Sequence, residues 1–303
     1  MNGNEAGERN MKWTIEDKHD GMLVRDYLVS VRAFSRRMIK TVKFSDGIRI
    51  NGNSATVRYI LHKGDLLEII FPEEQKESRL QPKEVPLHIV YEDGDVLVLE
   101  KQTNIPVMPS PHSNQASIAN GLLAYYLKQD ENYTAHIVTR LDRNTSGLML
   151  VAKHRYSHSQ LSSFQQKGLV KRAYTAFVDG YLKEKKGEID APIGRKPGSI
   201  IEREVREDGQ KAVTFYEVNQ EYDGFSSVKI LLQTGRTHQI RVHFTWLGSP
   251  LLGDDLYGGP MDRIKRQALH CHKLSFYHPF RQKWLHFSSV FPDDMRRILT
   301  CEN

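Results

Sequence analysis

The chain has 303 residues, of which 39% are hydrophobic and 26% charged, so it can form a substantial core within one large domain or two unequal ones. No apolar run approaches the roughly 18 residues of a membrane span, and the first ten residues lack the apolar centre of a signal peptide. We therefore expect a cytoplasmic protein with no membrane partner, a disordered tail over residues 1–11, and unpaired thiols at Cys271 and Cys301.

The net charge of +6 is concentrated near the N-terminus. Between Arg25 and Lys63 there are nine basic residues and only two acidic ones, an excess larger than that of the whole chain. Such a concentration is typical of a surface that binds a polyanion, most often nucleic acid. A solvated helix face with no partner is the alternative.

The basic stretch has the pattern of a small domain. Residues 21–31 and 35–44 are expected to form helices, with Ser35 as the N-cap of the second, and residues 47–53 and 55–71 to form strands with Gly and Asn turns. On the second helix, Met38 and Val42 can face a core. Its basic side chains project elsewhere and are the candidates for contact with a polyanion; they are Arg36, Arg37, Lys40 and Lys43.

A charged, proline-bearing stretch without periodicity follows, at residues 72–86. We place a domain at 12–75, a linker at 76–86 and a second domain at 87–303. The elements expected in the second domain are strand 87–101, helix 116–130, strands 135–138 and 147–153, helix 155–168, strands 170–182, 211–222 and 225–234, helix 237–248, and strands 269–278 and 283–290. Residues 183–188 are expected to be a solvated hairpin loop at most. Many strands with few helices predict an α+β fold with a mixed, largely antiparallel sheet.

The polar turn VTRLDRNTSG, residues 138–147, lies between two apolar segments and places Asp142 between Arg140 and Arg143. An Asx-turn is the ordinary explanation for such residues. A second distinctive stretch, QTGRTHQIRVHF, begins the helix at 237–248, which Thr234 or Thr237 can cap.

On this helix the residues expected to pack downward are Ile240, Phe244 and Leu247. Arg241 and His238 share a different side, and an enclosed arginine needs a carboxylate partner, for which Asp142 is the candidate. At about 4 Å and an effective dielectric near 20, such a pair attracts by roughly 4 kcal/mol before desolvation is subtracted. An ionised, oriented Asp142 would be a nucleophile or a base.

Three ordered motifs carry a resemblance to a known family. They are R-L-D-x-x-T-S-G at Arg140, Leu141, Asp142, Thr145, Ser146 and Gly147; R-x-Y-x-A-x-V-x-G at Arg172, Tyr174, Ala176, Val178 and Gly180; and G-R-x-H-Q-I-R-x-H at Gly235, Arg236, His238, Gln239, Ile240, Arg241 and His243. About residues 85–295 resemble the RluA-type RNA pseudouridine synthases, which include RluD-like enzymes of ribosomal RNA. Residues 12–75 resemble the alpha-L RNA-binding domain. The chain departs from the family at Thr139, where His is usual, and at Asn144, where Asp is common.

The resemblance implies the pseudouridine synthase fold and an isomerase that needs no cofactor and no metal. Asp142 would act covalently or by assisting a glycal intermediate, Arg241 would hold Asp142, and Tyr174 would stack on a flipped uracil, worth about 1 to 3 kcal/mol. Further substrate-binding candidates in the second domain are Arg140, Arg143, Arg236 and His238. We expect a monomer acting on structured RNA.

Large-subunit ribosomal RNA is the first expected substrate, and transfer RNA is an alternative. A non-catalytic RNA-binding or ribosome-assembly protein and an RNA glycosidase are the other functions considered. His270 and His272 lie on one face of an expected strand and invite a metal site. No further ligand has a recognisable spacing, which favours structural or RNA-facing histidines.

Overall fold

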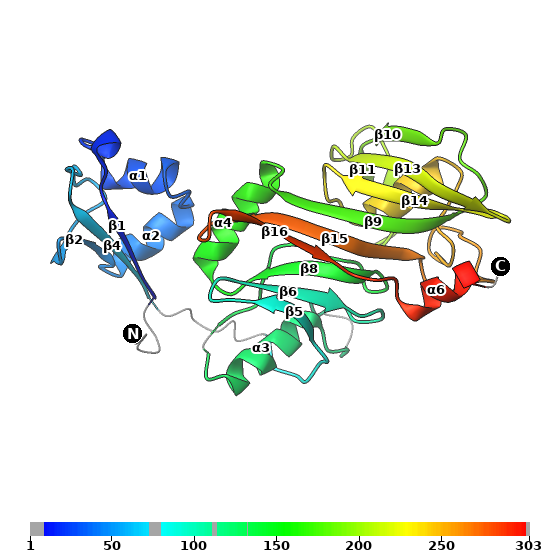
Figure 1. The fold of residues 1–303 in the computed structure, drawn as a ribbon, viewed down its shortest axis with the longest axis horizontal. Helices are drawn as coiled ribbons and strands as arrows, with labels where there is room; N and C mark the ends of the chain where they lie inside the picture. The colour runs from blue at the N-terminus through cyan, green and yellow to red at the C-terminus, as the bar shows by residue number, and fades with distance from the viewer. Residues whose placement is uncertain (1–8, 73–79, 111–113, 132, 301–303) are drawn as a thin grey trace.

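The computed structural model describes residues 9–72, 80–110, 114–131 and 133–300, which form a small N-terminal sheet and a ten-stranded sheet (Figure 1). Residues 1–8 of the expected tail and Cys301 lie outside the described residues. Residues 9–11 are not a tail, because they belong to a strand that pairs with Leu66–Phe71. In the part of the chain that is described, no helix is long and apolar enough to cross a membrane.

Residues 9–72, which we call the N-terminal module, fold around two short helices. Its elements are β1 (Arg9–Thr14), a 3-10 helix η1 (Asp17–His19), α1 (Val24–Ser30), α2 (Arg36–Phe44), β2 (Ile48–Ile50), β3 (Asn53–Ser54) and β4 (Leu66–Phe71), and the sheet order is β1-β4-β2-β3. Of the strand expected at 55–71, only β4 forms. The arrangement is consistent with the alpha-L type of RNA-binding domain.

Helix α2 has the two faces that the sequence predicts. The Oγ atom of Ser35 accepts a hydrogen bond from the backbone N–H of Met38 at 3.2 Å, which confirms Ser35 as the N-cap. Met38 and Val42 are buried in the module core, as expected. The four basic side chains are exposed: Arg36, Arg37, Lys40 and Lys43.

The rest of the described chain forms one long sheet, a separate two-stranded sheet and several helices (Figure 1). Its elements are β5 (His88–Glu92), β6 (Val96–Lys101), α3 (Ile118–Lys128), β7 (His136–Ile137), β8 (Ser146–Ala152), α4 (Arg155–Gln166), β9 (Val170–Asp179), β10 (Lys186–Asp190), β11 (Ile193–Arg195), β12 (Arg203–Val205), β13 (Val213–Tyr222), β14 (Phe225–Leu232), α5 (Gln239–Trp246), β15 (Leu269–His278), β16 (Lys283–Ser288) and α6 (Asp293–Thr300).

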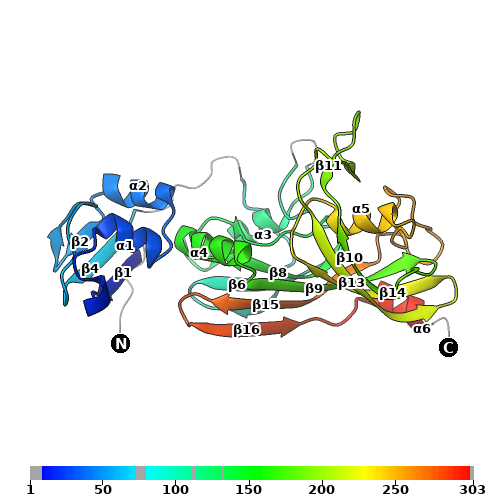
Figure 2. The same cartoon turned by 90° about the horizontal axis from the view of Figure 1, so that it is seen from above.

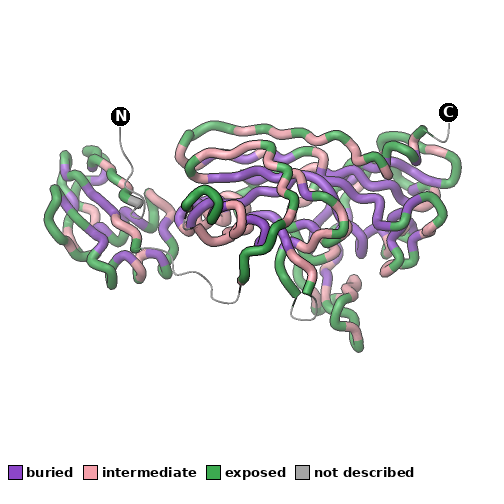
Figure 3. The backbone as a smooth tube through the Cα atoms, turned by 90° about the horizontal axis from the view of Figure 1, so that it is seen from below, coloured by how far each residue is buried: buried purple, intermediate pink, exposed green. Residues whose placement is uncertain are grey.

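The sheet order is β10-β13-β14-β9-β15-β8-β6-β5, with β16 paired to β15 and β7 to β8. Every pairing is antiparallel except that between β15 and β8. The prediction of an α+β fold with a mixed, largely antiparallel sheet is therefore confirmed. Strand β8 in the middle of the sheet is buried along its length, whereas the residues of β16 at the surface are exposed or partly buried (Figure 3).

Several local predictions were wrong, each because of a short-range feature. Residues 87–101 form a hairpin, since the Asp93 carboxylate accepts the backbone N–H groups of Asp95 and Val96 and turns the chain. Residues 183–188 include the start of β10, which pairs with β13. Helix α6 and the β11–β12 arm, which projects from the body in Figure 2, were not expected.

The module docks on α4 through one aromatic side chain. Tyr156 is 5% exposed, and its hydroxyl donates to the Arg32 carbonyl at 3.1 Å. Its ring lies 4.7 Å from the Phe34 ring and 5.4 Å from the Phe280 ring, measured between centroids. Gln160, one turn further along α4, donates to the same Arg32 carbonyl. Since Tyr156 joins the module core, the two parts are held together by packing as well as by the connecting chain.

Tyr156→Ala should release the module, because truncating a buried aromatic costs about 3 to 5 kcal/mol. We expect a larger radius of gyration in solution scattering and faster proteolysis between the two parts. The control is Tyr181→Ala, because Tyr181 is 59% exposed. Unchanged scattering of the Tyr156 variant would show that other contacts suffice for docking.

Candidate active site

The turn that carries Asp142 is fixed at the start of the central strand β8. The backbone N–H of Thr145 donates to the Asp142 carbonyl at 3.1 Å, and Thr139, which is 1% exposed, accepts the N–H of Leu150 through its hydroxyl at 2.8 Å. The threonine that departs from the family pattern thus secures the turn to β8. Asp142 remains partly accessible, with 27% of its side chain exposed.

The parallel pairing of β8 with β15 sets the position of this turn. Ser146 lies opposite His270 and Gly147 opposite Cys271. A Cβ atom at Gly147 would meet the Cys271 carbonyl oxygen at 2.3 Å, and the φ angle there is +111°, so only glycine fits. Burial raises the pKa of the free Cys271 thiol to about 12, which makes it an inert core residue.

The two histidines of β15 make structural hydrogen bonds. His270 is buried and shares a hydrogen bond with the Ser146 hydroxyl at 2.9 Å, and His272 shares one with the Thr175 hydroxyl at 3.2 Å. The geometry therefore favours the structural interpretation of both.

Helix α5 begins differently from the prediction. Its N-cap is His238, in the left-handed conformation with φ 57° and without a side-chain cap. Neither Thr234 nor Thr237 caps it, because the Gln239 side chain folds back, accepting from the Arg236 N–H at 2.9 Å and from the Thr234 hydroxyl at 2.9 Å. This brings Arg241 into the interior, where it is 6% exposed.

Of the three apolar residues expected to pack downward from this helix, Ile240 and Phe244 are buried. Leu247 is 38% exposed, which contradicts the prediction, because the helix ends at Trp246 and Leu247 is its C-cap.

Arg241 contacts two carboxylates. Its Nε and Nη2 atoms donate to Asp254 at 2.7 and 2.6 Å, while its Nη1 atom lies 3.5 Å from an oxygen of Asp142. Its guanidinium also lies over the Tyr257 ring, 4.9 Å from the centroid. Burial disfavours the charge, but the hydrogen bonds and charge of Asp254 outweigh this effect and raise the pKa of Arg241.

Asp254, which is fully buried, was not among the candidate residues. The sequence offered a weak signal for it, since its carboxylate lies within the otherwise uncharged run PLLGDDLYGG, next to a second aspartate. Only the folded chain distinguishes Asp254 from Asp255, which is exposed.

A cleft with a narrow inner part and a wide outer part opens beside Asp142. The inner part has a volume of about 60 Å³ and the outer part about 520 Å³. Both are lined by Asp142, Arg140 and Arg236. Tyr174 and His238 line only the inner part with Arg241, and Arg143 lines only the outer part. The four α2 side chains lie outside this cleft.

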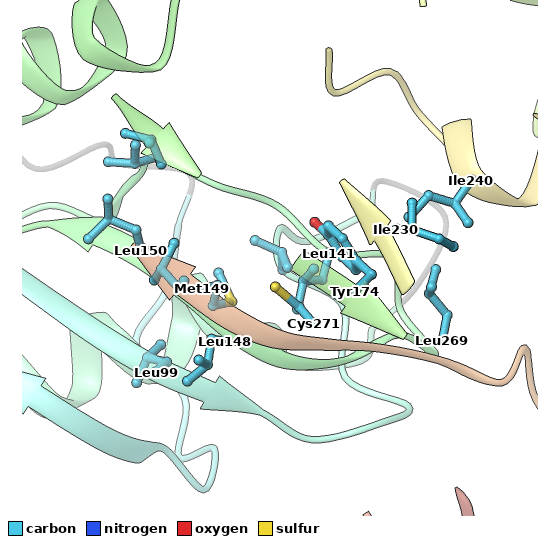
Figure 4. Packing of buried hydrophobic residues seen from close by; sticks show 14 of the residues in the cluster. Leu99, Leu141, Leu148, Met149, Leu150, Tyr174, Ile230, Ile240, Leu269 and Cys271 are labelled. Carbon is cyan, nitrogen blue, oxygen red and sulfur yellow. The ribbon is translucent and has the colours of Figure 1, made fainter. Parts of the chain in front are cut away.

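Tyr174 forms the apolar floor of the inner cleft among Leu141, Leu269 and Ile230 (Figure 4). It is 3% exposed, burial raises the pKa of its hydroxyl, and that hydroxyl accepts from Arg172 at 3.2 Å. The ring therefore lines the inner cleft as part of the core, with its polar end already bonded.

The basic residues of the cleft are held by the backbone and by polar neighbours. Arg143 donates twice to the Asn104 side chain, at 3.0 and 2.7 Å, and Arg236 donates to the Lys211 carbonyl at 2.9 Å. Burial lowers the pKa of His238, whose Nδ1 shares a 2.9 Å hydrogen bond with Tyr257. At neutral pH this histidine is therefore an uncharged hydrogen-bonding group.

Lys101, which is buried beneath the Asp142 turn, was also missed. It is 1% exposed, and its Nζ donates to the carbonyls of Gln102, Ile105 and Arg143 at 2.8, 3.0 and 2.8 Å. Burial lowers the pKa of Lys101 to about 7, although the Asp142 charge opposes this fall. The bond to the Arg143 carbonyl joins the end of β6 to the turn.

Lys101→Met should destabilise the fold by about 2 kcal/mol at pH 8, because it leaves three inward-facing carbonyls without their donor. Between about pH 7 and 10.5, Lys101 is protonated in the unfolded chain but has lost its proton in the folded chain. The free energy of unfolding of the wild type should therefore rise with pH relative to that of the variant. Denaturant unfolding of both proteins at several pH values measures this difference. A difference that is constant with pH would contradict the lowered pKa.

Asp254→Asn should lower the free energy of unfolding by about 3 kcal/mol, since it removes the nearer of the two carboxylates that balance the buried Arg241 guanidinium. Asp255→Asn is the matched control. The Asp255 carboxylate is next in the sequence but exposed, so its loss should change the free energy of unfolding by less than about 0.5 kcal/mol. Equal denaturation midpoints for the two variants would show that the Arg241 pair does not support the fold.

Comparisons with known proteins agree with this geometry. Residues 95–246 match the family model described as RNA pseudouridylate synthase. The chain is 50% identical over 283 residues to a Bacillus subtilis protein named uncharacterized RNA pseudouridine synthase YjbO, covering 93% of this chain and 100% of the relative. It is 34% identical over 281 residues to ribosomal large subunit pseudouridine synthase D of Haemophilus influenzae, covering 88% of this chain and 86% of that protein.

Among solved structures, human RNA pseudouridylate synthase domain containing 1 aligns with a TM-score of 0.57 at 26% identity, covering 70% of this chain and 86% of that one. Human RNA pseudouridylate synthase domain containing 4 shares the fold, with a TM-score of 0.58 at 21% identity, covering 70% of this chain and 92% of that one. The predicted resemblance is confirmed: the chain belongs to the RluA-type family of RNA pseudouridine synthases, which are isomerases.

Proposed function

We propose that this enzyme isomerises specific uridines of large-subunit ribosomal RNA and that Asp142 is its catalytic residue. The observation that carries the proposal is the position of the Asp142 carboxylate, which is partly exposed at a cleft and lies 3.5 Å from a buried guanidinium. The ribosomal substrate is inferred from relatives named ribosomal large subunit pseudouridine synthase D. Transfer RNA is the alternative substrate, and the cytoplasm is the expected location for either.

The reaction conserves all atoms of the nucleotide. The bond between uracil N1 and the ribose C1′ breaks, the base turns, and a bond from C5 to C1′ replaces it, while the proton of C5 moves to N1. Asp142 would either form a transient covalent bond or take a proton from the sugar on the way to a glycal. In both routes, Arg241 keeps the carboxylate oriented while its own position is fixed by Asp254.

Tyr174 is proposed to lie against the uracil after the base has left the RNA stack. Arg140, Arg143, Arg236 and His238 are proposed to contact the surrounding nucleotide, since all four line the cleft. The RNA strand would meet the exposed basic face of α2 at a distance from the cleft. That face, formed by Arg36, Arg37, Lys40 and Lys43, would supply sequence-independent attraction to phosphates.

Asp142→Asn should abolish pseudouridine formation, by at least about 10³-fold, while RNA affinity changes little, because the substitution keeps the side-chain shape and removes the reactive oxygen. The measurement is a map of pseudouridine in RNA from cells without this gene, complemented with wild type or the variant. Sites restored by wild type alone would also identify the RNA.

Asp255→Asn provides the control for a lost carboxylate nearby and should restore every site. If the protein binds RNA without catalysis, cells complemented with wild type and with Asp142→Asn should give the same map of pseudouridine. Release of free uracil by the purified protein would indicate a glycosidase instead.

A further inference from the structure

A groove of about 590 Å³ lies between the N-terminal module and helix α4. Ser35 and Arg37 of the module form one side, at the beginning of α2, and Arg155 and Ser162 of α4 belong to the other. Figure 2 shows α2 and α4 beside each other, and the Tyr156 contact fixes their separation. The groove is distinct from the cleft at Asp142, with which it shares no lining residue.

Its lining has the chemistry of a site for a sugar–phosphate backbone. Arginines come from both sides, and several hydroxyl groups line the walls. His136 and His158 also line the groove, with their ring centroids 5.7 Å apart. Among the described residues that line the groove, none carries a carboxylate. Arginine and hydroxyl donors are the groups that contact phosphate and ribose oxygens, and a groove without acidic residues does not repel a polyanion.

Helix α4 presents this lining as a continuous stripe. Arg155, Ser159, Ser162 and Gln166 lie at spacings of four, three and four residues, so they share one face of the helix. Contact with the N-terminal module is made by Tyr156 and Gln160, which lie on a neighbouring face of α4. The polar stripe is therefore not needed for the docking contact.

The same helix leads from the groove to the cleft. Gln165 lines the outer part of the cleft, and the adjacent Gln166 lines the groove. The 12 residues of α4 span about 18 Å at 1.5 Å per residue. A strand whose target base is in the cleft can therefore continue along α4 to the start of α2 without leaving the surface.

We propose that the groove between α2 and α4 binds the sugar–phosphate backbone of the substrate RNA beside the modified uridine. This assignment rests on the proposed function in one respect: the occupant of the groove is the RNA whose uridine enters the cleft. It assigns substrate contact to the stripe on α4, so recognition by the module and reaction at Asp142 are linked by one bound strand.

Ser162→Glu tests the proposal, with Ser162→Gln as its matched control, since the two side chains differ in charge and hardly in size. The probes are large-subunit ribosomal RNA transcripts and total cellular RNA, titrated at several salt concentrations. We expect Ser162→Glu to bind about tenfold more weakly at low salt, because a carboxylate next to phosphates is repelled. Ser162→Gln should remain within about twofold of wild type.

A third variant, Gln220→Glu, adds the same charge on an exposed position of β13 and should bind like wild type. Thermal unfolding of all variants checks that each is folded. Equal affinity of the Glu and Gln variants for both probes would overturn the proposal and leave the groove to a non-nucleic-acid occupant. A loss of affinity that Gln220→Glu reproduces would overturn it too, since it would reflect net charge.

Pseudouridine formation by wild type in the same transcripts is measured separately. If wild type is inactive on every transcript while Ser162→Glu still weakens binding, the proposed ribosomal substrate fails and the groove assignment stands. If wild type is active and the two Ser162 variants bind and react equally, the groove assignment fails and the proposed function stands.

Discussion

The buried guanidinium of Arg241 is the interaction on which the site depends. A charge without solvent must be matched by an opposite charge and by hydrogen bonds, and Asp254 supplies both through two short bonds. This arrangement occupies one edge of the guanidinium and leaves Nη1 directed at Asp142. Helix α5 and the segment carrying Asp254 therefore have to pack in one relative position, which is also the position that places Nη1 of Arg241 against the Asp142 carboxylate.

A buried lysine acts on the same turn from below. Lys101 holds the Arg143 carbonyl, one residue beyond Asp142, and ties it to the segment after β6. Asp142 is thus positioned through its side chain by Arg241 and through its backbone by Lys101. Groups fixed before the substrate arrives need no reorganisation during the reaction, which is the usual origin of electrostatic catalysis.

The sequence predicted the features that depend on local patterns. Periodicity indicated the sheet and the helices, Ser35 was recognisable as a cap, and ordered motifs indicated Asp142, Tyr174 and Arg241. It did not indicate Asp254 or Lys101, because their importance comes from burial and from partners on other elements. It also misplaced the start of α5, where the Gln239 side chain, and not a threonine, bonds the turn.

The docking of the N-terminal module changes what the module can contribute. A module attached only by a flexible linker raises the local concentration of RNA near the catalytic domain, but it does not fix the distance or direction between the two. Here Tyr156 and Gln160 bond the Arg32 carbonyl and bury an aromatic contact. The basic face of α2 consequently keeps a set geometry relative to Asp142. Under the function proposed above, the shape of an RNA, in addition to its charge, would then determine which uridine reaches the cleft.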